Sequence, residues 1–96
     1  MSSVPIESTF VPSKDAIFRD LNGESVILDL VSGTYFGLNP VGTRIWQLIE
    51  RHGRLQTVLD ELRQEYEAGP DELERDLLDL VNRLADAGLG EVKQTP

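Results

Sequence analysis

Residues 16–38 carry the pattern of three short β-strands joined by two tight turns. Three runs rich in apolar and β-branched residues are separated by the dipeptides Asn22-Gly23 and Ser32-Gly33; the runs span 16–21, 24–31 and 34–38. Asn-Gly is a strong hairpin signal because a type I′ turn requires positive φ at both central residues. The pattern therefore predicts a three-stranded antiparallel β-meander.

The register of this meander follows by counting if each turn has two central residues. The expected pairs are Leu21 with Glu24, Phe18 with Ile27, Val31 with Thr34, and Asp29 with Phe36. The third run is then a sheet edge, and residues 34–38 contain neither the charge nor the proline that soluble proteins usually place on an edge. Tyr35 and Phe36 must point to opposite faces of the sheet, and the pattern does not decide which faces inward.

From residue 39 onward, apolar positions recur every three or four residues, which is the period of an α-helix. Asn39 before Pro40 is a typical helix start, because asparagine caps free N–H groups and proline lacks an N–H where none is needed. Gly53, Gly69 and Gly88 are expected helix ends. The pattern predicts helices over 40–52, 55–68 and 71–87 and, with the meander, an α+β fold.

The third predicted helix has a wider apolar face than one contact surface requires. Its core stripe consists of Leu73, Leu77, Leu80, Val81 and Leu84. Leu78 and Ala85 flank that stripe, with Asn82 between them. We therefore expect a second neighbour on the Leu78 flank, from this chain or from a bound partner.

The ends of the chain show no sustained pattern. Residues 1–14 contain two prolines and four serines and are expected to form a flexible N-terminal arm. Residues 91–96 are expected to form a short C-terminal tail. The sequence thus predicts one domain over 15–90, in a chain whose 96 residues suit a single small core.

Acidic residues outnumber basic ones, seventeen to nine, which gives a formal charge of −8. Residues 1–53 hold six acids and four bases, and residues 54–96 hold eleven and five. Nucleic-acid binding depends on basic side chains that neutralise phosphates, so we expect no nucleic-acid partner. No apolar run reaches the ~20 residues that span a bilayer, and residues 1–10 lack the basic segment of a signal peptide. We therefore expect a cytoplasmic protein without a membrane partner.

The side chains offer little to catalysis or to metal binding. The chain has no cysteine and one histidine, which excludes a thiolate nucleophile, a Cys-type zinc site and a multi-histidine site. His52 is expected at a helix C-terminus beside Gly53, where histidine interacts favourably with the helix dipole. Five acids of the third helix are expected to form a solvated face; they are Asp71, Glu72, Glu74, Asp76 and Asp79. We expect no catalytic residue, no metal site and no cofactor.

Two stretches of the chain carry residues at the spacing of a known domain family. Over 20–46 these are Asn22-Gly23-Glu24, Ile27-Leu28-Asp29, Gly33-Thr34-Tyr35-Phe36, Leu38-Asn39, Gly42 and Ile45-Trp46; over 76–89 they are Asp76, Leu80, Leu84 and Gly88-Leu89. In this order they resemble the PqqD family. PqqD acts in the biosynthesis of pyrroloquinoline quinone (PQQ), and the same domain recurs as the recognition element of ribosomally made, modified peptides, including lasso peptides.

The resemblance implies a winged helix-turn-helix-like fold and a non-enzymatic, chaperone-like role in PQQ biosynthesis. In that family the leader of a precursor peptide adds as a strand beside the third strand, in the groove next to the third helix, and is presented to a radical S-adenosylmethionine (SAM) enzyme. In this chain the resemblance assigns main-chain pairing with the leader to Thr34, Tyr35, Phe36, Gly37 and Leu38. Groove lining falls on Tyr35, Phe36, Leu78, Asn82 and Ala85, with Arg75 placed to pair with a leader acid.

Three alternatives stay open at this point. The same mechanism would serve another precursor, such as a lasso peptide. The helices 40–52 and 55–68 with their short glycine-containing turn also resemble a helix-turn-helix, which would make the protein a winged-helix DNA-binding regulator. Finally, the N-terminal arm or a bare strand edge would allow a homodimer.

Overall fold

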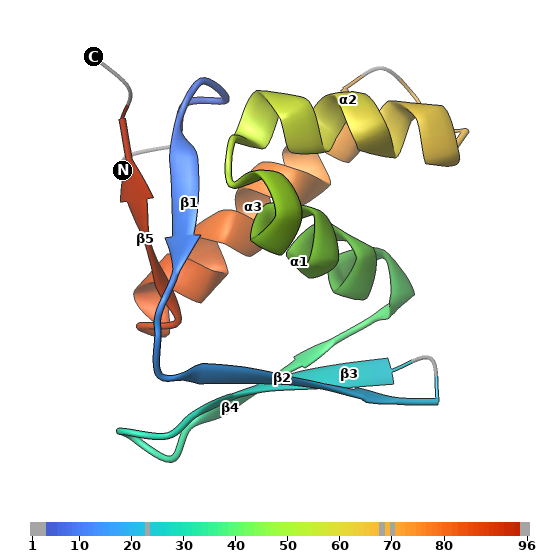
Figure 1. Cartoon of the computed structure of the whole chain (residues 1–96). Coiled ribbons are helices and arrows are strands. Elements are labelled where there is room, and N and C mark those ends of the chain that lie inside the picture. The colour runs from blue at the N-terminus through green and yellow to red at the C-terminus, as the bar shows by residue number, and fades with distance from the viewer. Residues whose placement is uncertain (1–3, 23, 68, 70, 95–96) are drawn as a thin grey trace.

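The computed structural model describes residues 4–22, 24–67, 69 and 71–94, which form five strands and three helices (Figure 1). In chain order these are β1 (Thr9–Pro12), β2 (Ala16–Leu21), β3 (Glu24–Asp29), β4 (Tyr35–Leu38), α1 (Pro40–His52), α2 (Leu55–Glu65), α3 (Glu72–Asp86) and β5 (Gly90–Lys93). The predicted α+β class is therefore confirmed, and so are the three helices.

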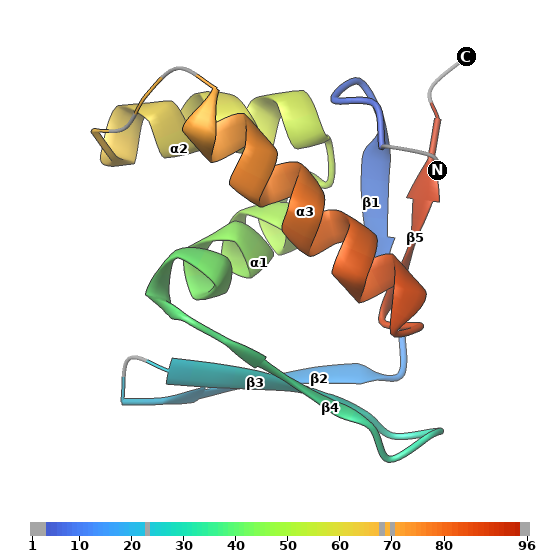
Figure 2. The ribbon, with the colours of Figure 1, turned by 180° about the vertical axis from the view of Figure 1, so that it is seen from behind.

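The meander β2-β3-β4 forms a three-stranded antiparallel sheet with β3 at its centre. All three helices lie over one face of this sheet and none covers the other (Figures 1 and 2). The first predicted register is confirmed, because Leu21 pairs with Glu24 and Phe18 with Ile27. Asn22 in the connecting turn has φ 54°, as a type I′ turn requires, while Gly23 lies outside the described residues.

The second predicted register is wrong by two residues. Phe36 pairs with Ile27 instead of Asp29, and Thr34 closes the turn on Asp29, whose backbone N–H donates to the Thr34 carbonyl at 2.8 Å. The Asp29 carboxylate accepts hydrogen bonds from the Val31 N–H and the Ser32 hydroxyl, each at 3.0 Å. These bonds stabilise a four-residue turn in place of a two-residue one. A shift of two leaves every side chain on its expected face.

The chain ends form a second sheet that the sequence analysis did not predict. β1 pairs antiparallel with β5, so the arm expected over 1–14 and the tail expected over 91–96 both contribute strand residues. Phe10 of β1 has no exposed surface, and a Cβ on Gly90 would collide with its ring. The meander is thus only part of the β-structure, and the core includes a segment outside the predicted 15–90 domain.

The helices begin and end largely where their capping residues indicate. The Asn39 side chain accepts a hydrogen bond from the Gly42 N–H at 2.7 Å, and Gly53 ends α1 with φ 73°. α2 ends at Glu65, three residues earlier than expected, because Tyr66 has extended backbone. Trp46 is 1% exposed and is one of the largest side chains in the core. No helix among the described residues is long and apolar enough to cross a membrane.

Candidate functional site

A cavity of about 310 Å³ lies between strand β4, the first turns of α1, and α3. It is lined by Phe36, Gly37, Leu38, Asn39, Val41, Gly42, Ile45, Asp76, Asp79, Leu80 and Arg83. One wall is therefore a strand, one is the capped start of a helix, and one is a helix flank that carries both apolar and charged side chains.

β4 is an edge strand of its sheet, so half of its backbone groups lack a partner strand. Because the Asp29 N–H donates to the Thr34 carbonyl, Asp29 and Thr34 form a hydrogen-bonded pair. Bonded and non-bonded pairs alternate along an antiparallel ladder. Ile27–Phe36 is then also a bonded pair, whereas Leu28–Tyr35 and Val26–Gly37 are not. Consequently the N–H and C=O groups of Tyr35 and Gly37 point away from β3, toward the open edge beside the cavity.

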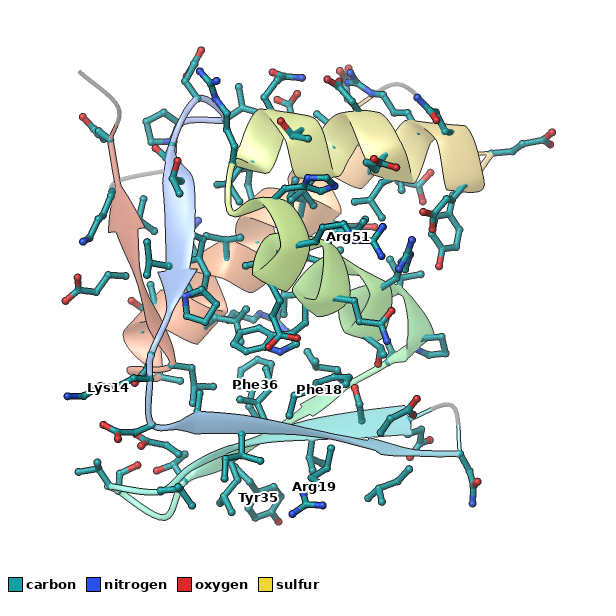
Figure 3. All side chains as sticks on the ribbon, viewed as in Figure 1. Lys14, Phe18, Arg19, Tyr35, Phe36 and Arg51 are labelled. Carbon is teal, nitrogen blue, oxygen red and sulfur yellow. The ribbon has the colours of Figure 1, made fainter. Side chains whose placement is uncertain are left out.

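Phe36 faces the helices and Tyr35 faces away from them (Figure 3). Phe36 is half-buried, packs against the core and lines the cavity, while Tyr35 is 73% exposed. The alternation of side chains along the strand did not decide which of Tyr35 and Phe36 faces inward; the side on which the helices pack decides that it is Phe36. Of the predicted strand residues, Phe36, Gly37 and Leu38 line the cavity, whereas Thr34 lies before β4 in the turn.

The cavity lies on a different flank of α3 from the one predicted. A helix turns about 100° per residue, so Leu78 and Leu80 lie about 160° apart around the axis, on either side of the buried stripe Leu77, Val81 and Leu84. Leu80 lines the cavity and Leu78 does not. Neither do Arg75, Asn82 and Ala85; Leu78 and Ala85 pack against the core, and the Asn82 amide donates to the Leu78 carbonyl at 3.0 Å.

The cavity residues that the site prediction missed are Asn39, Val41, Gly42, Ile45, Asp76, Asp79, Leu80 and Arg83. The family spacing contained Asn39, Gly42, Ile45, Asp76 and Leu80, and this was the one signal that pointed to them. Their apolar members read equally well as core, because periodicity alone does not separate a half-buried wall from a packed interior.

The charged groups of the cavity are arranged along α3. Arg83 Nε lies 3.2 Å from Asp79 Oδ2, an exposed pair one helical turn apart. Asp76 has no ion pair with another described residue. These side chains leave net negative charge on the helix wall of the cavity, where a basic or neutral peptide group is favoured.

The ionisable groups with shifted pKa values lie away from this cavity. Arg44 donates two hydrogen bonds to the Glu65 carboxylate, both 2.8 Å, and so lowers the pKa of Glu65 and ties α1 to α2. Burial raises the pKa of Glu50. His52 is the last residue of α1, as predicted, and its Nε2 lies 3.5 Å from the Glu61 carboxylate of α2. The described residues include no group of three or more His, Cys, Asp or Glu side chains placed to hold a metal ion.

The family model described as coenzyme PQQ synthesis protein D (PqqD) matches residues 24–89. The structure of TbiB1 in complex with the TbiA(beta) leader peptide has 38% sequence identity and a TM-score of 0.78, covering 84% of this chain and 94% of that one. A lasso peptide synthetase B1 complexed with the leader peptide has 28% identity and a TM-score of 0.77, covering 86% and 98%. A search of curated proteins gave no match. The match covers most of the chain and includes β3, β4, all three helices and the cavity between them, and the chain therefore belongs to the PqqD family.

Proposed function

We propose that this protein binds the leader segment of a ribosomally made precursor peptide by adding it as a strand to β4. The observation that carries the proposal is the open β4 edge, where the backbone groups of Tyr35 and Gly37 have no partner strand and Gly37 lines the cavity. Main-chain pairing supplies affinity for a peptide of any sequence, and alternate side chains entering a pocket supply selectivity. The two similar structures are complexes with leader peptides, which supports the same class of ligand here.

The strength of such binding follows from its parts. About four backbone hydrogen bonds at roughly 0.5–1.5 kcal/mol each, with one or two apolar anchors at about 1.5–3 kcal/mol each, give a gross gain of up to about 12 kcal/mol. Ordering the peptide and losing its free motion offset part of this gain. We expect sub-micromolar to micromolar affinity, which captures a precursor and still releases it.

The role proposed is recognition without catalysis, carried out in the cytoplasm. Lasso-type precursors are the first ligands to test, because both similar structures come from leader-binding proteins and one is a lasso peptide synthetase B1. A role in PQQ biosynthesis with a radical SAM enzyme as partner is the second candidate, supported by the description of the family model. The short connection between α1 and α2 also supports the winged helix-turn-helix-like description of the fold. Asp76 and Asp79 on the cavity wall of α3 disfavour use of that arrangement on DNA.

The proposal is tested by titrating synthetic leader peptides into the protein, with calorimetry for affinity and amide chemical shifts for location. Trp46 is 1% exposed and is a poor fluorescent reporter. In the variant Gly37→Pro the N–H that faces the open edge is lost, while the pairing of Phe36 with β3 is retained. We expect leader affinity to fall at least tenfold.

The matched control is Asp20→Pro, because the Asp20 N–H faces outward on the opposite edge of the same sheet. This variant should bind leader as the unaltered protein does. Equal binding by all three proteins, or shift changes confined to β2, would exclude strand addition at β4. Retention of duplex DNA on a filter at low salt would instead support the regulator alternative.

A further inference from the structure

The outer face of the β2-β3-β4 sheet is apolar, although no helix covers it (Figure 1). Antiparallel sheets with one face on the core usually turn polar side chains to water on the other. Here Tyr35 and Arg19 project from that outer side (Figure 3), and Ile17, Leu28 and Val26 belong to the same cross-strand rows. The outer positions of β2 and β3 are Ile17, Arg19, Leu21, Glu24, Val26 and Leu28, and they include one basic and one acidic residue.

Several of these side chains are largely exposed to solvent. Leu21 is 60% exposed and Tyr35 is 73% exposed. Arg19 makes no ion pair with any described residue. Tyrosine and arginine are enriched among the residues that dominate protein interfaces, and contiguous apolar patches mark interaction sites.

We propose that this outer face docks the enzyme that acts on the captured precursor, through an apolar patch on that enzyme with a carboxylate opposite Arg19. The inference rests on the proposed function, because it takes the chain to hold a peptide on which another protein works. The leader-binding edge and the docking face adjoin each other: the leader occupies the β4 edge beside the cavity on the helix side, and the enzyme contacts the outer face of the sheet.

The size of the face favours a transient partner over a stable dimer of this chain. β2 and β3 have six residues each and β4 has four. With strands ~4.8 Å apart and ~3.3 Å per residue, the face covers at most roughly 14 by 20 Å, or under about 300 Å². A stable interface buries about 800 Å² per partner, whereas smaller contacts are typical of transient encounters. The charge of −8 also opposes a second copy, since like-charged molecules repel, and it favours an enzyme surface that is neutral or basic around the patch.

The docking face is continuous with the leader-binding edge. A leader strand added to β4 would extend the sheet by one strand beside Tyr35, and alternate leader side chains would join the outer face. The loaded protein therefore offers a larger surface than the empty one. This predicts that the enzyme binds the leader-loaded protein more tightly, which would direct it to proteins that carry a substrate.

The test measures binding of the purified enzyme encoded with the precursor, by biolayer interferometry, with and without saturating leader peptide. Arg19→Glu and Leu21→Ser alter the face at exposed positions on β2, away from β4. Lys93→Glu is the matched control, because it makes the same charge change at an exposed position on β5. We expect at least a tenfold loss of enzyme affinity in the two face variants, no more than a twofold change in Lys93→Glu, and unchanged leader affinity in all.

Each other outcome overturns the inference. Enzyme affinity within twofold of the unaltered protein in both face variants would show that the enzyme docks elsewhere. Absence of any enzyme binding to the loaded protein would show that the enzyme does not dock on this protein, while leader titration would still report separately on the proposed function. Sedimentation that finds a dimer of the unaltered protein, abolished in the face variants, would assign the face to a second copy.

Discussion

Truncation of Leu80 decides which flank of α3 binds the peptide. Leu80 lines the cavity next to β4, is half-buried in the free protein, and has Leu78 as a half-buried counterpart on the opposite flank. Leu80→Ala removes three carbon atoms, each worth ~0.8 kcal/mol when fully removed from water. If bound peptide covers the half of this surface that is still exposed, the loss is about 1.2 kcal/mol, or roughly sevenfold in Kd.

The matched variant is Leu78→Ala, which removes the same atoms from the other flank. Both leucines pack against the core, so both variants should lose similar thermal stability, which circular dichroism measures before binding is compared. Calorimetric titration with leader peptide should then show weaker binding in Leu80→Ala and unchanged binding in Leu78→Ala. The opposite result would return the groove to the flank that carries Arg75, Asn82 and Ala85, and would refute the assignment made from the cavity.

Two further predictions concern stability. Phe10→Ala deletes a fully buried ring and should lower the free energy of unfolding by about 3–5 kcal/mol. In a domain of this size that loss lowers Tm by at least ~12 °C. A loss below ~1 kcal/mol in urea unfolding would show that β1 is not part of the core. Glu65→Gln removes a carboxylate whose pKa the Arg44 hydrogen bonds hold below its ordinary value of 4.5. Because the pKa of Glu65 is lower in the folded state, its carboxylate stabilises the folded protein at neutral pH, and the variant should be less stable by about 0.5 kcal/mol. This difference in stability should vanish as the pH falls through the folded-state pKa. A difference that stays constant from pH 7 to pH 2 would contradict the prediction.

The hairpin of β2 and β3 and the start of α1 were predictable because their signals are local. Asn22 adopts the positive φ that its turn requires, and Asn39 caps the helix that Pro40 begins. The open β4 edge was also predictable, because an uncharged run without proline after two turns leaves its outer backbone groups unpaired. These features depend on residues within a few positions of one another, where backbone preference and hydrogen bonding act directly.

Most of the remaining features depended on contacts between distant parts of the chain. β1 and β5 join residues that lie roughly eighty positions apart in the sequence, and nothing near Phe10 or Gly90 indicates that their packing closes the core. The turn after Asp29 has four residues because its carboxylate binds groups that a two-residue turn would not offer it. The helical pattern placed Leu80 in the core stripe and Leu78 on a flank; both pack against the core, and only the position of the sheet makes Leu80 a cavity wall as well. The sequence by itself determined which main elements form and that β4 has an unpaired edge. The tertiary structure decided which side chains surround that edge, because periodicity fixes the faces of a helix but not the elements that pack against them.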